Sequence, residues 1–290
     1  MTNVTDGVHG LRGPGRRELV VGGSAGLALG ALGALGLAAP SARAAGVDTR
    51  AQLTAALDQY MATRAGAAGL TVRDNRDGSY FHWRPRTQQT HSTIKVLILI
   101  TTLKIAQDRG RALTSTQKSL ASRMIRFSDN DATNTLLTQA TLRRCRIVAD
   151  QLGMSSTVVL GGTSFRSSSW WGHSTSTTRD LVQMMNQVVL GTYLSPGRRA
   201  YVRELMANVT STQTWGLGDG LPSDVHVELK NGWGPRSDGY RLNGVGFVSG
   251  RGRSYQMSFL SRSSNGYSYG QTTVNRLSRI VFDALDVPLR

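Results

Sequence analysis

Ser92-Thr93-Ile94-Lys95-Val96-Leu97-Ile98-Leu99-Ile100 joins a hydroxyl, an amine and an unbroken apolar run in one short segment. The apolar block 96–100 and the stop at Arg109-Gly110 predict a helix that is buried on all sides. Ser92 and Lys95 are three positions apart, so they share one face of that helix. A serine hydroxyl attacks well only when a neighbouring base takes its proton. A lysine serves as that base where burial or nearby positive charge lowers its pKa.

A second match to the same spacing, Ser115-Thr116-Gln117-Lys118, shows that the pattern alone is not specific. Serine is a favoured helix N-cap, and an amphipathic stripe follows Ser115, so we predict that Ser115 caps a helix. Ser92 opens the more apolar helix and is therefore the candidate nucleophile. On this segment alone, a capping role for Ser92 and a snorkelling role for Lys95 stay open.

Two further motifs follow Ser92 along the chain. The hydroxyl in Ser128-Asp129-Asn130 can pass a proton from the lysine to a leaving group, while the amide of Asn130 holds a substrate amide. Lys230-Asn231-Gly232 ends a strand-like run, where a cation and an amide bind a carboxylate and glycine allows close backbone approach. Each tripeptide by itself is also typical of turns. The order of the three motifs is what predicts a catalytic site.

The rest of the chain predicts a sheet interrupted by helices. Helical periodicity covers 49–65, 115–127, 131–150, 178–190, 195–208 and a C-terminal stripe at Val274, Leu277, Val281 and Leu285. Strand-like runs are Gly69–Arg73, Tyr80–Trp83, Val225–Lys230, Asn243–Ser249 and Tyr255–Ser261. We predict one α/β (α+β) unit, a five-stranded antiparallel sheet flanked by helices, with a mainly helical lobe at about 91–214 inserted between the second and third strands.

The first residues have the pattern of an export signal. Arg16-Arg17 precedes an uncharged Gly/Ala/Leu-rich run from Leu19 to Ala42, and Ala42-Arg43-Ala44 is typical of a cleavage site. We predict a twin-arginine-type signal at 1–44 and a folded domain at 45–290 that is secreted or associated with the cell envelope. An uncleaved membrane anchor is the alternative, because the apolar run is long enough to span a bilayer.

Composition limits the partners. The 34 Lys plus Arg residues outnumber the 18 Asp plus Glu residues and give a net charge of +16, which favours anionic partners such as acidic cell-envelope polymers. Most of the basic residues are arginines and no basic-aromatic module is present, so we predict no nucleic-acid partner. The single cysteine, Cys145, cannot form an intramolecular disulfide and is predicted to be a buried, inert thiol.

The ordered set Ser-x-x-Lys, Ser-Asp-Asn and Lys-x-Gly resembles class A β-lactamases and penicillin-binding proteins. The resemblance covers nearly all of 45–290, including SDNDATNTLL, GHSTSTTRDLVQMM and the run bearing ELKNG. It implies the β-lactamase/DD-peptidase-like fold, a serine hydrolase activity without metal or cofactor, and a β-lactam or cell-wall peptide-like substrate.

The same resemblance implies roles for individual residues. Ser92 forms the acyl-enzyme, and Lys95 and Ser128 move protons. The backbone N–H groups of Ser92 and Trp233 form the oxyanion hole. The implied substrate-binding residues are Asn130, Lys230, Asn231, Gly232, Trp233 and Arg241, with Arg236 as the alternative to Arg241.

Three departures from the family pattern shape the functional prediction. Class A β-lactamases carry a glutamate that activates the deacylating water, but residues 153–178 contain no Asp or Glu. His173 is a possible substitute, although a lone His in a Ser-rich loop is more typical of a surface. The interval between Ser92 and Ser128 is short, which predicts a more open cleft edge, and Asn231 replaces the usual Thr or Ser.

Acylation needs a nucleophile, a base and an oxyanion hole, whereas rapid hydrolysis also needs an activated water. We therefore predict an exported acyl enzyme with slow deacylation. The alternatives are a true β-lactamase that hydrolyses β-lactams and a secreted binding protein that performs no turnover.

Overall fold

The computed structural model describes residues 48–160 and 169–289. The export signal predicted at 1–44 lies outside these ranges, as does part of residues 153–178, the acid-free loop, a stretch without Asp or Glu. Within the two described ranges, no helix is both long enough and apolar enough to cross a bilayer.

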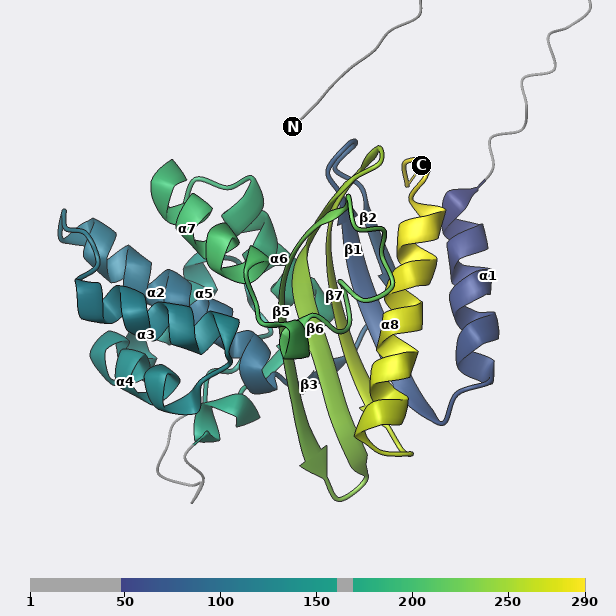
Figure 1. The fold of residues 1–290 in the computed structure, drawn as a ribbon, viewed down its shortest axis with the longest axis horizontal. Helices are drawn as coiled ribbons and strands as arrows, with labels where there is room; N and C mark the ends of the chain where they lie inside the picture. Colours follow the sequence, from purple (N-terminus) through teal and green to yellow (C-terminus); the bar gives the residue numbers. More distant parts are fainter. Residues whose placement is uncertain (1–47, 161–168, 290) are drawn as a thin grey trace, which may run out of the picture. The chain divides into compact units, whose positions relative to one another are not determined.

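An antiparallel sheet of five strands forms the centre of the fold, as the sequence predicts (Figure 1). The strands lie in the order β2-β1-β7-β6-β5, so β5 is an edge strand. Alternating apolar side chains place Leu70 and Val72 of β1 in the core. The strand bounds are β1 Gly66–Asp74, β2 Tyr80–Trp83, β5 His226–Arg236, β6 Gly239–Gly250 and β7 Arg253–Ser263.

Strand β5 is longer than its sequence pattern predicts. Residues 231–236 contain Gly and Pro, which are typical of turns, yet they pair with β6 as far as Arg236 opposite Gly239. The prediction that Lys230-Asn231-Gly232 ends a strand is therefore wrong, because the motif lies in the middle of β5. Pro235 is tolerated because an edge strand leaves one row of backbone groups without a strand partner.

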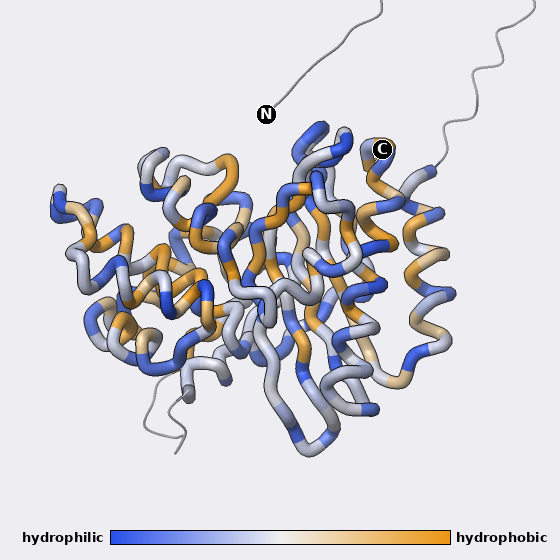
Figure 2. The backbone as a smooth tube through the Cα atoms, in the orientation of Figure 1, coloured by the Kyte–Doolittle hydropathy of each residue, from blue (hydrophilic) through white to orange (hydrophobic). Residues whose placement is uncertain are grey.

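Helices cover both faces of the sheet. Helices α1, Thr49–Ala62, and α8, Tyr267–Ala284, pack on one face, and α6, Thr178–Val189, packs on the other. Two apolar cores result, one between the sheet and α1 and α8, and one inside the helical lobe. Hydrophobic residues accordingly concentrate along the strands and on the inner sides of the helices (Figure 2).

The helical lobe is built around α2, Lys95–Asp108, which is buried over most of its length, as the apolar run predicts. A 3₁₀ turn, η1, His91–Ile94, precedes it. The predicted helix 131–150 is two helices, because Thr141 adopts a φ of 66°, which interrupts the helical backbone. The other helices of the lobe are α3 Ser115–Arg126, α4 Asn130–Ala140, α5 Leu142–Gln151 and α7 Pro196–Ala207.

The predicted helix cap at Ser115 is wrong by one residue. Thr114 is the N-cap of α3: its side chain accepts a hydrogen bond from the backbone N–H of Gln117, and the Gln117 side chain accepts one from the N–H of Thr114. This reciprocal pair is a capping box, which leaves the exposed Ser115 without a capping role.

Short elements missed by the sequence pattern connect the lobe to the sheet. Strand β3, Thr87–Gln89, pairs with β4, Thr175–Thr177, and this pairing holds the chain just before Ser92 beside the segment that follows η3, Trp170–His173. Another 3₁₀ turn, η4, Ser211–Gln213, lies before β5. Three residues per strand are too few for an alternating pattern to be recognised.

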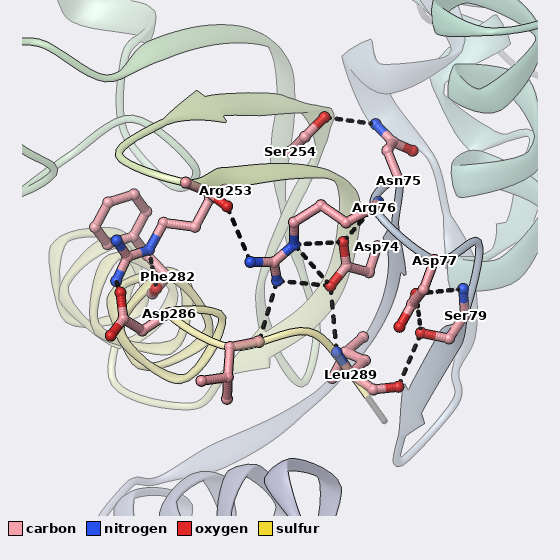
Figure 3. A network of polar contacts seen from close by, with 12 residues as sticks. Asp74, Asn75, Arg76, Asp77, Ser79, Arg253, Ser254, Phe282, Asp286 and Leu289 are labelled. Atoms are coloured by element: carbon pink, nitrogen blue, oxygen red, sulfur yellow. Dashed lines mark hydrogen bonds and ion pairs between the residues drawn. The ribbon is translucent and has the colours of Figure 1, made fainter.

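A buried carboxylate anchors the C-terminal residues to the sheet (Figure 3). Asp74 is fully buried at the end of β1 and pairs with Arg76, 2.7 Å from one guanidinium nitrogen. The same carboxylate accepts a hydrogen bond from the backbone N–H of Leu289. Arg76 also donates to the carbonyl of Val287, and Ser79 donates to the carbonyl of Leu289. The last described residues are thus tied to the β1–β2 turn.

Candidate active site

A cavity of about 340 Å³ opens where the edge strand β5 meets the helical lobe. Its wall comes from η1, α4, η3 and β5, which are far apart in sequence. The residues that line it are His91, Ser92, Asn130, Ser169, Trp171, Gly172, His173, Trp233, Gly234 and Pro235.

Ser92 lies in η1, directly before the buried helix α2. His91 adopts a φ of 47°, a costly conformation for a residue other than glycine, and surrounding packing is needed to hold it. Strand β5 supplies that packing. A Cβ on Gly232 would lie 2.6 Å from the Ser92 backbone nitrogen, and a Cβ on Gly234 would lie 2.4 Å from the His91 ring. Glycine at both positions lets β5 lie against the serine.

Lys95 is completely buried at the first turn of α2. Its ammonium nitrogen donates to the backbone carbonyl of Ser128 at 2.6 Å and to Oδ1 of Asn130 at 2.9 Å, and it lies 3.2 Å from Oγ of Ser128. Burial lowers the pKa of Lys95 to about 7, against the opposing effect of Asp129. A substantial fraction of the amine is therefore neutral near pH 7.

Ser128 and Asn130 are held by the turn between α3 and α4. Ser128 adopts a φ of 58°, and Asp129 caps α4 by accepting a hydrogen bond from the N–H of Ala132. Arg123 fixes the same carboxylate, with its Nε 2.8 Å from Asp129. These contacts turn the Ser128 carbonyl and hydroxyl toward Lys95.

Lys230 is fully buried on β5 and donates to the backbone carbonyl of Asn231. Burial lowers the pKa of Lys230 well below its usual value, and the nearby charge of Lys95 lowers it further. The two amines therefore lie close enough for the charge of Lys95 to oppose protonation of Lys230.

Two of the predicted substrate-binding residues, Asn231 and Arg241, instead contact other parts of the protein. The side-chain amide of Asn231 donates to the backbone carbonyl of Gln213, and the guanidinium of Arg241 pairs with Asp238 at 2.9 Å. Neither residue lines the cavity. Arg236, the alternative to Arg241, is exposed at the end of β5 and lies 3.4 Å from Nδ1 of His173. His173 is half-buried and lines the cavity, so it is not a plain surface residue.

Trp171 is the residue that sequence reasoning missed. Its indole is 2% exposed, and the Lys95 nitrogen lies 4.7 Å from the ring centre. The indole N–H donates to Oδ1 of Asn134 at 2.9 Å, which fixes the ring. The signal was present in the sequence, because two tryptophans lie in the acid-free loop before the Thr175 strand. A large buried aromatic thus occupies the space beside the lysine.

Comparison with known families matches the chain to the beta-lactamase enzyme family over residues 105–285, which is more than half of its length. The chain belongs to the beta-lactamase enzyme family. The matched part of this beta-lactamase family member includes Ser128, Asn130 and Lys230, whereas Ser92 and Lys95 precede it. A search of curated proteins gave no significant match.

Solved class A β-lactamases share the fold of this beta-lactamase family member. The enzyme from Bacteroides cellulosilyticus is 16% identical with a TM-score of 0.73, over 82% of this chain and 98% of that one. The class A β-lactamase from Mycobacterium abscessus is 19% identical with a TM-score of 0.69, over 81% and 100% of the two chains. A β-lactamase from Chitinophaga pinensis is 17% identical with a TM-score of 0.72, over 81% and 99%. At this identity the likeness establishes the fold, and the chemistry is argued from the site.

Proposed function

We propose that this protein is an exported serine hydrolase or acyl-transfer enzyme that forms an acyl-enzyme on Ser92 and releases it slowly. Its substrates are β-lactams or amides of D-amino-acid peptides. The observation that carries the proposal is the buried Lys95 amine with a pKa of about 7, one helical turn from Ser92 and in contact with Ser128 and Asn130. The export signal and an attraction to anionic envelope polymers belong to the same proposal.

Acylation proceeds by proton transfers within this cluster. Neutral Lys95 takes the hydroxyl proton of Ser92 as Oγ forms its bond to the substrate carbonyl carbon. The backbone N–H groups of Ser92 and Trp233 stabilise the oxygen that becomes negative. When the carbon–nitrogen bond breaks, the proton passes from Lys95 through the Ser128 hydroxyl to the leaving nitrogen. The Lys230 amine, which is a hydrogen-bond donor in either protonation state, is the group that we propose to contact the leaving group.

Deacylation has no comparable set of residues to activate a water. None of the described residues that line the cavity is Asp or Glu, and the indole of Trp171 occupies the space beside Lys95. Lys95 is then the remaining base, and the indole restricts access of water to it. We therefore favour slow hydrolysis over efficient β-lactamase turnover. The contacts of Lys95 with Ser128 and Asn130 favour an enzyme over a binding protein.

The rate of acylation should depend on pH through Lys95. Only its neutral form accepts the proton of Ser92, and this form predominates above a pKa of about 7. The second-order rate constant with benzylpenicillin should fall about tenfold per pH unit below 7 and level off above it. Stopped-flow measurements between pH 5 and 9 give the profile. Lys95→Arg is the matched control: its permanent charge should remove the rising limb and nearly all of the rate, and an unchanged profile would exclude Lys95 as the base.

Burst kinetics test slow release directly. With a chromogenic β-lactam, we expect a rapid phase equal to the enzyme concentration, followed by turnover slower by a factor of roughly 10² to 10⁴, the usual contribution of a general base. Intact-mass measurement during the slow phase should show one adduct per chain on Ser92. A linear trace with fast turnover would support a true β-lactamase, and the absence of any adduct would support a binding protein.

A further inference from the structure

The rim of the cavity beyond Pro235 is basic. Arg236 follows Pro235 on β5, and its guanidinium faces His173 across the opening, with 3.4 Å between Nη1 and Nδ1. A guanidinium only donates, so Nδ1 of His173 accepts in this contact. The guanidinium of Arg236 on β5 and the imidazole of His173 on η3 therefore meet at one end of the cavity.

The positive charge at this rim is not balanced by nearby carboxylates. Among the described residues, Arg236 forms no ion pair with an acidic side chain, and Asp238, two positions away, pairs with Arg241 and Arg262. The pKa of His91 inside the cavity shows the same positive charge: burial, together with His173, Arg236 and Arg241, lowers it to about 4. An anion at this rim would meet a guanidinium that is exposed and able to bind it in bidentate fashion.

The orientation of the bound substrate determines whether its leaving group or its acyl arm reaches this rim. The leaving group lies on the side of Ser128 and Lys230, because the proton is delivered there. The acyl arm therefore extends the other way, from the Trp233 N–H along Gly234 and Pro235, which both line the cavity. Trp233 and Arg236 are three residues apart, which is about 10 Å along an extended strand.

We propose that the acyl arm of the natural substrate ends in a carboxylate, about 10 Å from the reacting carbonyl, and that Arg236 and His173 bind it. This inference rests on the proposed acylation of Ser92 and names the class of acyl donor that the site selects. The substrate class is a D-amino-acid peptide or related amide with a free carboxylate at the far end of its acyl chain.

Two penicillins with arms of equal size test the proposal. 6-Aminopenicillanic acid acylated with adipic acid ends in a carboxylate, and the adipamic acid derivative ends in a carboxamide. The carboxylate arm should acylate the wild-type protein about 10 to 100 times faster, the range expected for a charge-assisted bidentate contact. In Arg236→Gln this preference should fall to near unity. Equal rates in the wild-type protein, or a preference that survives Arg236→Gln, would overturn the proposal.

A matched variant separates a binding site from general attraction. Arg251 lies in the β6–β7 turn, at the other end of β6 from the β5–β6 turn, and pairs with the exposed Asp224. Arg251→Gln removes the same charge, so it should keep the carboxylate preference. Loss of the preference in both variants would mean that only the overall charge of the protein is involved, and the proposed site would be wrong.

Binding to Ser92→Ala keeps this test independent of catalysis. Calorimetry on that variant measures the affinity of each penicillin without acylation. A 10 to 100-fold tighter binding of the carboxylate arm, lost on adding Arg236→Gln, would support the rim site even if no acyl-enzyme forms. Equal affinities would reject the rim site, whereas a missing adduct in the wild-type protein would reject only the proposed acylation.

Discussion

Ser92→Ala is expected to abolish covalent labelling by a fluorescent penicillin or a fluorophosphonate. The hydroxyl is the atom that forms the acyl bond, so its removal leaves no adduct to detect, and turnover should fall by roughly 10⁶-fold if it follows other serine hydrolases. Ser92 is half-buried in η1, and alanine fits the same backbone. Gel fluorescence and intact mass measure the labelling, and the variant should melt close to the wild-type temperature.

Ser115→Ala is the matched control for this prediction, because Ser115 begins the second Ser-x-x-Lys match. It is exposed at the first residue of α3, and Thr114 provides the cap. The variant should label normally and change the free energy of unfolding by no more than about 0.5 kcal/mol. Thr114→Ala should cost about 1 kcal/mol. A labelled peptide that contains Ser115 would show that the nucleophile has been placed on the wrong helix.

Trp171→Glu is expected to accelerate release of the acyl-enzyme by roughly 10²-fold, because it puts a carboxylate beside Lys95 and opens space for a water. The nearby carboxylate should also raise the pKa of Lys95 and move the acylation profile to higher pH. Single-turnover measurements of acylation and deacylation separate the two effects. Loss of the buried indole should destabilise the protein by about 3 kcal/mol or more, so both rates are measured well below the melting temperature.

Trp171→Phe separates the shape of this side chain from its hydrogen bond. Phenylalanine fills most of the same space but loses the contact with Asn134. Deacylation should stay slow in this variant if occlusion of water is the cause. Fast release in Trp171→Phe would show that occlusion of water is not the cause, and no acceleration in Trp171→Glu would show that the indole does not limit hydrolysis.

The sequence predicts the sheet and the buried helix well, because both depend on long apolar patterns. Alternating apolar and polar residues, as in β1 and β7, predict the strands of the sheet. The apolar run after Lys95 predicts the buried helix α2. The ends of β5 could not be predicted in this way. Its Gly and Pro residues look like a turn, and only pairing with β6 and close packing on η1 make them a strand.

The site was predicted as far as short motifs determine it. Local geometry places Ser92 and Lys95 on one helical turn and Ser128 beside Asn130, and the order of the motifs predicts that the two pairs meet, as the contacts of Lys95 with Ser128 and Asn130 show. Contacts between distant segments could not be derived from such motifs. Three contacts depend on how η3, η4 and the β5–β6 turn pack. They are the hydrogen bond from Asn231 to the carbonyl of Gln213, the ion pair of Arg241 with Asp238, and the position of Trp171 beside Lys95.

The strand order has a consequence for biosynthesis. Strand β1 lies between β2 and β7, although 178 residues separate Asp74, at the end of β1, from Arg253, at the start of β7. The hairpin of β1 and β2 can therefore pair with β7 only near the end of translation. Such distant pairings slow folding and leave a strand edge exposed on the ribosome. The tie between Asp74 and Leu289 forms later still. A nascent chain truncated before β7 cannot close the sheet on which the Ser92 cleft rests, so only full-length protein should become active.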